Sequence, residues 1–264
     1  MKQDCPHDST ADPLTGIKLP ISTIAAFLDG PGLAQLDNVL TDQWLAEARN
    51  EIQSFVAKKG SGDFDLTDPA EWDCPTIQAL VRNADLETLM HELSQGIPKS
   101  APDRDGYSTT VLRILDGTSG IHSRSLVWHY DAAAVTLVIP IIIPDRRGGE
   151  LVVFANRRPH RKSALVNVAE KAIVQSRLWG RRVIWQFLGD PNRYAVPLQP
   201  GSFYFFRGYR TLHGTLPWPK GSLRVTLVLH YGYPYGSDNK VLRFAQNAQR
   251  QLRRKRPAAA YPDV

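Results

Sequence analysis

Cysteine and long apolar runs are scarce in this sequence of 264 residues. The two cysteines, Cys5 and Cys74, lie far apart and form no C-x-x-C pair, which excludes a disulfide framework and a zinc–thiolate site. The longest aliphatic run, residues 135–143, is broken by Pro140 and is too short to span a membrane, and the first nineteen residues are polar, without a signal sequence. We therefore expect a cytoplasmic protein with no membrane partner.

The body of the chain, apart from its C-terminal end, also has no large net charge. The formal net charge is +6, but residues 243–264 alone hold six basic residues and one acid, which leaves the rest nearly neutral. A neutral body does not predict binding to nucleic acid, so no nucleic-acid partner is expected. Residues 240–264 are interpreted as a basic, solvated C-terminal tail.

The length and a hydrophobic content of 42% are enough for one sizeable core, and residues 1–264 are expected to form a single domain. Its first part, residues 1–106, is predicted to be mostly helical, because apolar residues recur at helical spacing between capping and breaking residues. Helices are predicted at 41–58 with Thr41 as N-cap, at 76–83 after Pro75, and from Asp85 to Gly96.

From residue 107 to 232 the sequence changes to short segments rich in β-branched and aromatic residues, separated by Gly, Pro, Asn and Asp. This pattern predicts strands. We place them at residues 108–115, 126–131, 134–143, 149–155, 164–167, 194–198, 202–207 and 223–231. Short strands joined by tight turns favour a mainly β jelly-roll barrel behind the N-terminal helices.

One connection, residues 157–192, is longer than two strands need. It includes a predicted helix near 167–178 and mixes aromatic with basic residues, such as Trp179 and Arg181. Long connections inside compact domains are usually functional. We predict a lid-like insert that covers the functional site and determines substrate choice, with a helix that only packs outside the barrel as the alternative.

His129-Tyr130-Asp131 is the first motif that carries chemistry. Alternation along the predicted strand 126–131 would send His129 and Asp131 to one face, where they could chelate a metal. The partner is His213, because two histidines and one carboxylate form a facial triad that binds non-haem iron and leaves three positions open. Ordinary surface or partly buried positions are expected for the histidines without a carboxylate two residues on, which include His122, His160 and His230.

Arg224 opens the last predicted strand, eleven residues after His213. A chelating 2-oxo acid could fill two open positions on the iron and dioxygen the third. The far carboxylate of the acid then needs a cation, which the Arg224 guanidinium supplies. Arg113, in an early strand, could bind the same acid or an acidic group of the substrate, and an outward-facing position is the alternative.

Together these residues resemble the Fe(II)/2-oxoglutarate-dependent dioxygenase superfamily, and their spacing resembles its phytanoyl-CoA dioxygenase-like branch. The resemblance covers residues 107–232 and rests on an ordered set: His129-Tyr130-Asp131, Gly-Gly-Glu-Leu at 148–151, Pro-Gly-Ser at 200–202, His213 and Arg-Val-Thr at 224–226. It implies a double-stranded β-helix (cupin-like) fold, Fe(II), 2-oxoglutarate as co-substrate and dioxygen. It also implies a co-substrate-binding hydroxyl at Thr215, and Thr226, on the face of Arg224, could serve likewise.

The activity that the resemblance implies is hydroxylation of an unactivated C–H bond of a small metabolite, amino acid or natural-product intermediate, with release of succinate and CO2. Halogenating members lack the carboxylate, so Asp131 argues against halogenation, whereas desaturation and ring closure stay open. A nucleic-acid- or protein-modifying dioxygenase is an alternative, although the nucleic-acid branch has a second arginine where this chain has His230. A catalytically silent barrel that acts as a binding protein is another.

Overall fold

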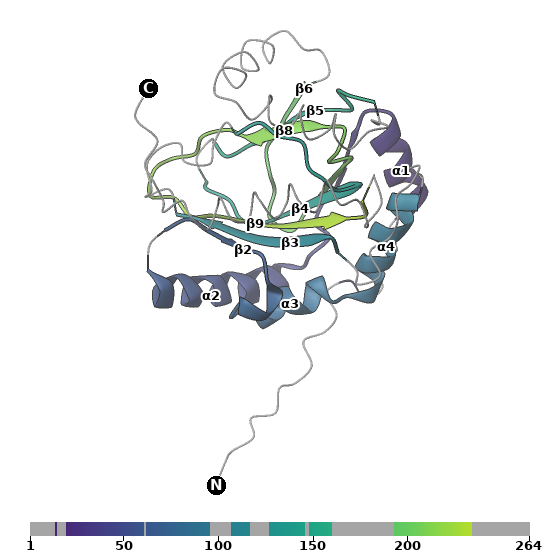
Figure 1. Ribbon diagram of the computed structural model, residues 1–264. Helices are drawn as coiled ribbons and strands as arrows, with labels where there is room; N and C mark the ends of the chain where they lie inside the picture. Colours follow the sequence, from purple (N-terminus) through teal and green to yellow (C-terminus); the bar gives the residue numbers. More distant parts are fainter. Residues whose placement is uncertain are drawn as a thin grey trace, which may run out of the picture.

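The computed structural model describes residue 14 and residues 20–60, 62–95, 107–116, 127–145, 148–159 and 193–233. In these residues two antiparallel sheets face each other, and helices cover the outer face of the larger one (Figure 1). The larger sheet has the order β1-β7-β4-β9-β3-β2, with bounds Leu33–Leu36, Phe203–Phe206, Val135–Ile142, Arg224–Tyr231, Thr109–Leu115 and Phe64–Leu66. The smaller sheet has the order β6-β5-β8, with bounds Arg193–Val196, Leu151–Phe154 and Leu212–Thr215.

The helices precede β3 along the chain and are α1 (Ile21–Asp29), α2 (Asp42–Lys59), α3 (Pro75–Val81) and α4 (Ala84–Gln95), with a 3-10 turn at Pro69–Glu71. Thr41 caps α2 as predicted, since its hydroxyl accepts a hydrogen bond of 3.2 Å from the backbone N–H of Trp44. The three predicted helices are confirmed. The sequence did not predict α1, which starts after Pro20 without a side-chain cap. None of the helices described is long and apolar enough to cross a membrane.

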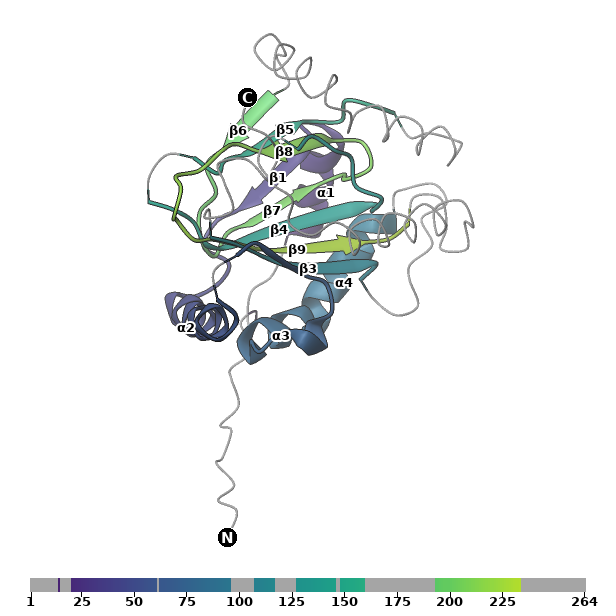
Figure 2. The same cartoon turned by 60° about the vertical axis from the view of Figure 1, so that its left-hand side comes forward.

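Alternation along β9 divides its side chains between two environments. Val225, Leu227 and Leu229 belong to the main hydrophobic core, under the helices. The intervening residues lie on the opposite face of β9, because Val228 packs in a cluster with Leu151 and Val153 of the smaller sheet. Arg224, Thr226 and His230 share this face with Val228. In Figure 2 the smaller sheet lies across from β9. This second apolar cluster, which also includes Val138, Tyr204 and Phe206, lies between the two sheets.

Most of the predicted strands are confirmed with shifted ends, but the predicted strand 126–131 is wrong. Of its residues, 127–131 form no strand, and only an isolated bridge joins His129 to His213. The short strands β1, β2 and β8 were not predicted. The predicted strand 164–167, the helix 167–178, the tail 240–264 and all but the first residues of the insert 157–192 lie outside the described residues.

Candidate metal centre

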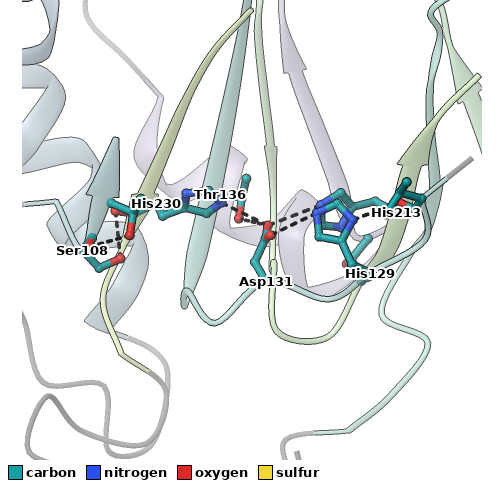
Figure 3. Close-up of polar contacts among 9 residues, drawn as sticks. Ser108, His129, Asp131, Thr136, His213 and His230 are labelled. Atoms are coloured by element: carbon teal, nitrogen blue, oxygen red, sulfur yellow. Dashed lines mark hydrogen bonds and ion pairs between the residues drawn. The ribbon is translucent and has the colours of Figure 1, made fainter. Parts of the chain in front are cut away.

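His129, Asp131 and His213 converge inside the barrel (Figure 3). Each offers one ligand atom, and these atoms lie within 4.8 Å of one another. The Asp131 carboxylate faces both rings, with Oδ1 3.6 Å from Nε2 of His129 and Oδ2 3.4 Å from Nε2 of His213. The arrangement could therefore hold a metal ion on two nitrogens and one oxygen.

Backbone pairing brings the two imidazoles together. His129 N–H donates to the carbonyl of His213 at 3.0 Å, and His213 N–H donates back at 3.1 Å. The ring centroids are consequently 4.3 Å apart. His129 and Asp131 are therefore not placed by alternation along a strand, as was predicted: the N–H of Asp131 bonds the carbonyl of Gly208, in the turn before β8.

Both histidines are oriented by backbone carbonyls. Nδ1 of His129 lies 3.0 Å from the carbonyl of Val127, and Nδ1 of His213 lies 3.1 Å from that of Thr211. A carbonyl only accepts, so each Nδ1 carries the proton and each Nε2 keeps a lone pair directed at Asp131. Metal-ligating histidines are held in this way. The residues present thus fit a divalent iron ion.

The charges also suit a cation. Burial would raise the pKa of Asp131, but the positive charge that the rings of His213, His230 and His129 carry when they are protonated holds this pKa well below its usual range. Burial lowers the pKa of His213 despite the nearby carboxylate. At neutral pH the site therefore holds an ionised carboxylate beside the neutral imidazole of His213, which is the protonation state that metal binding requires.

His230 and Thr136 brace Asp131 from the larger sheet. The Thr136 hydroxyl donates to Oδ2 at 2.7 Å, and Nε2 of His230 lies 3.4 Å from the same atom. The other ring nitrogen of His230 is buried and has no hydrogen-bond partner among the described residues. This role of His230 was not predicted from the sequence, although the even spacing of Arg224 and His230 along β9 places both on one face of the strand and indicates it.

Arg224 is buried near the start of β9, with 3% of its surface exposed. Its Nε donates to the carbonyl of Gly149 at 3.2 Å. Its guanidinium lies 5.8 Å from the ring centroid of Trp218. The buried Nε1 of Trp218 has no hydrogen-bond partner in the described part of the chain. None of the carboxylates that the structure describes pairs with Arg224. Burial and the nearby Arg113 lower its pKa to about 9, so it is still a cation at neutral pH.

The remaining predicted residues line the same interior. Arg113 lies opposite Thr226 in the β3–β9 register, and its Nε donates to Asp65 at 2.8 Å. Against the effect of burial, Asp65 and Asp131 raise the pKa of Arg113. Thr226 is buried, whereas Thr215 is half-buried on the smaller sheet, opposite Leu151. Among the described residues, Arg113 thus already has an anionic partner and Arg224 has none.

No protein-family model and no curated sequence matches this chain. Solved structures do. The non-haem alpha ketoglutarate dependent epimerase SnoN from nogalamycin biosynthesis has a TM-score of 0.57 at 19% identity, over 81% of this chain and 83% of its own. The carbocyclase SnoK from the same biosynthesis has 0.55 at 18%, over 92% and 93%, and a prolyl hydroxylase from Trichoplax adhaerens has 0.52 at 13%, over 81% and 89%.

The chain has the double-stranded β-helix fold. At these identities the likeness establishes the arrangement of the sheets, as predicted. The similar structures include an epimerase, a carbocyclase and prolyl hydroxylases, and they do not single out the phytanoyl-CoA dioxygenase-like branch. SnoN has also been solved with Fe3+ and alpha ketoglutarate bound.

Proposed function

We propose that this chain is an Fe(II)- and 2-oxoglutarate-dependent oxygenase that hydroxylates a C–H bond of a small metabolite, amino acid or natural-product intermediate. The observation that carries the proposal is the pairing of two features inside one barrel. One is the His129, Asp131 and His213 cluster, and the other is the buried Arg224 guanidinium, which has no anionic partner among the described residues. The similar structures, whose printed names describe alpha ketoglutarate dependent enzymes, support it.

His129, Asp131 and His213 would hold the iron, which when bound would supply the activation of dioxygen, coupled to decarboxylation of 2-oxoglutarate to succinate and CO2. Asp131 would neutralise part of the metal charge while Thr136 and His230 fix the direction of its carboxylate.

The co-substrate would be recognised by a cation and hydroxyls. Arg224 would bind the far carboxylate of 2-oxoglutarate. This carboxylate would take the place of the water that the guanidinium lost on burial. The buried N–H of Trp218 is a further donor beside it. Thr226 and Thr215 would add hydroxyls from the two facing sheets, and Arg113, which is paired with Asp65, lies opposite Thr226 on β3.

The spacing of the motifs supports the phytanoyl-CoA dioxygenase-like branch, and the carboxylate of Asp131 supports oxygenation over halogenation. In the interior, Arg113 is paired with Asp65, and Asp131 with its imidazoles. A small, largely uncharged reacting group suits this lining, since a buried charge requires a partner.

The test is release of succinate from 2-oxoglutarate by purified protein, with Fe(II) added and then removed by a chelator. We expect metal-dependent succinate release in the wild type and none in His129→Ala or His213→Ala, because each variant loses one of three ligands. Asp131→Gly should retain some metal and lose hydroxylation. Metal binding without any turnover of 2-oxoglutarate would favour a binding protein instead, and full activity in either histidine variant would refute the ligand assignment.

A further inference from the structure

Arg158, just after β5, is buried against the residue that separates two of the candidate ligands. Only 4% of its surface is exposed, and its Cζ lies 3.9 Å from the ring centroid of Tyr130. Tyr130 is itself 6% exposed and packs with Trp128, Phe154 and other apolar residues of one cluster. At this distance the planar guanidinium stacks on the aromatic face, where a cation is attracted to the ring.

The same arginine also holds the turn of residues 207–211. Its Nε donates to the carbonyl of Tyr209 at 2.6 Å, its backbone N–H donates to the carbonyl of Arg210 at 3.3 Å, and Nε of Arg210 donates back to the carbonyl of Arg158 at 3.2 Å. This turn supports two ligands. The carbonyl of Gly208 accepts from the N–H of Asp131, and that of Thr211 accepts from Nδ1 of His213.

Arg158 therefore contacts both segments that carry the metal-binding side chains. On one side it stacks on the 129–131 segment, and on the other it bonds the 207–211 turn. We propose that Arg158 is a positioning residue that fixes these two segments relative to each other and so sets the geometry of the metal centre. The inference rests on the metal-binding role proposed above.

Lysine cannot replace arginine in this position. A lysine keeps the charge but has neither a planar group to stack on Tyr130 nor an Nε–H to donate to Tyr209. Arg157 is a matched control, because it is the neighbouring arginine, is exposed, and lies over Phe154 with 5.6 Å between Cζ and the ring centroid. Arg158→Lys and Arg157→Lys thus make the same chemical change at a buried and an exposed position.

The experiment is a titration of full-length protein with Co(II) alone, followed through the absorption bands of the bound ion, together with thermal unfolding. We expect Arg158→Lys to bind Co(II) about tenfold more weakly, as is usual when a residue that orients metal ligands is lost, and to show shifted absorption bands. Arg157→Lys should match the wild type in both. The band positions report ligand geometry, which a loss of stability alone would not move.

Each outcome decides the inference. If Arg158→Lys binds Co(II) with wild-type affinity and spectrum, the residue only supports the fold, even where the melting temperature falls, and the proposal is overturned. If that variant does not fold, Tyr130→Leu removes the stacked ring instead; tenfold weaker binding would support the proposal and unchanged binding would overturn it. If the wild type binds no Co(II) at the triad, the proposed function itself is overturned. A difference between the wild type and the Arg158 variant tests only the positioning role.

Discussion

The guanidinium of Arg224 is buried inside the barrel, and none of the carboxylates of the described residues pairs with it. The Gly149 carbonyl and the face of Trp218 are partial substitutes for the water that the group has lost. Gly149 makes this contact possible, because its φ of +75° suits glycine and a Cβ there would lie 3.2 Å from Nε of Arg224. A buried cation in such surroundings is stabilised when a ligand supplies the anion.

Replacement of Arg224 by Met tests this at the residue scale. The far carboxylate of 2-oxoglutarate would then be left unpaired in a dry site, at a cost of roughly 2–5 kcal/mol. The affinity for 2-oxoglutarate should fall by a factor of about 30 or more, at 1.4 kcal/mol per decade. Calorimetric titration of the Mn(II)-loaded protein with 2-oxoglutarate measures this affinity. Arg49→Met, which loses a hydrogen bond to the Ile141 carbonyl on the helical side, is the control, and equal affinity in both variants would contradict the assignment.

His230 supports Asp131 from β9, and His230→Leu should weaken metal binding. Leucine fills similar space but cannot donate to Oδ2 of Asp131, so the carboxylate would keep only the Thr136 hydrogen bond. We expect about tenfold weaker binding of Co(II). His91→Leu is the control, because His91 contacts the hydroxyl of Tyr231 outside the barrel. An unchanged dissociation constant in His230→Leu would show that Thr136 suffices.

At the scale of elements, the turn before β8 places a glycine where no side chain fits. A Cβ on Gly208 would collide with the Thr136 hydroxyl and lie 2.8 Å from Oδ2 of Asp131, although its backbone is not in the left-handed region. Gly208→Ala should therefore displace the carboxylate, reduce metal affinity at least about tenfold and leave the helices folded. Co(II) titration and far-ultraviolet circular dichroism measure the two effects. Wild-type affinity would mean that the turn can shift.

The elements that sequence predicted are those whose pattern is local. Helix α2 has its cap and apolar stripe within one segment, and β9 has eight residues with a clear alternation. Strand β8 could not be predicted, because it is four residues long and contains Gly214, which disfavours a strand. The Trp128 ring packs closely on this glycine, since a Cβ there would lie 3.0 Å from the ring.

The same distinction applies to the site. The ligand types and their order along the chain are visible in the sequence, which is why His129, Asp131 and His213 could be selected. The interactions that hold these side chains in place are not visible in the sequence. The bridge between His129 and His213 and the contact of His230 with Asp131 depend on register between distant segments, and hydrophobic pattern does not fix the register of a five-residue loop.

At the scale of the whole molecule, the candidate metal site joins the two sheets. His213 belongs to β8 of the smaller sheet, while Asp131 is held by Thr136 on β4 and His230 on β9 of the larger one. Figure 3 shows the side chains in a row from one sheet to the other. A bound ion would therefore cross-link elements that otherwise meet mainly through the apolar cluster between the sheets.

Metal binding should accordingly stabilise the entire fold. An ion that binds only the folded chain adds about 2.7 kcal/mol at a concentration of 100 times its dissociation constant. For a domain of this size that corresponds to a rise in melting temperature of about 5–10 °C. Thermal unfolding of chelator-treated protein with and without Mn(II) measures the rise, and 2-oxoglutarate should add to it in the wild type but not in Arg224→Met. His213→Ala should show no rise, because the ion would lose its ligand on the smaller sheet. An equal rise in that variant would place the stabilising ion at some other position in the molecule.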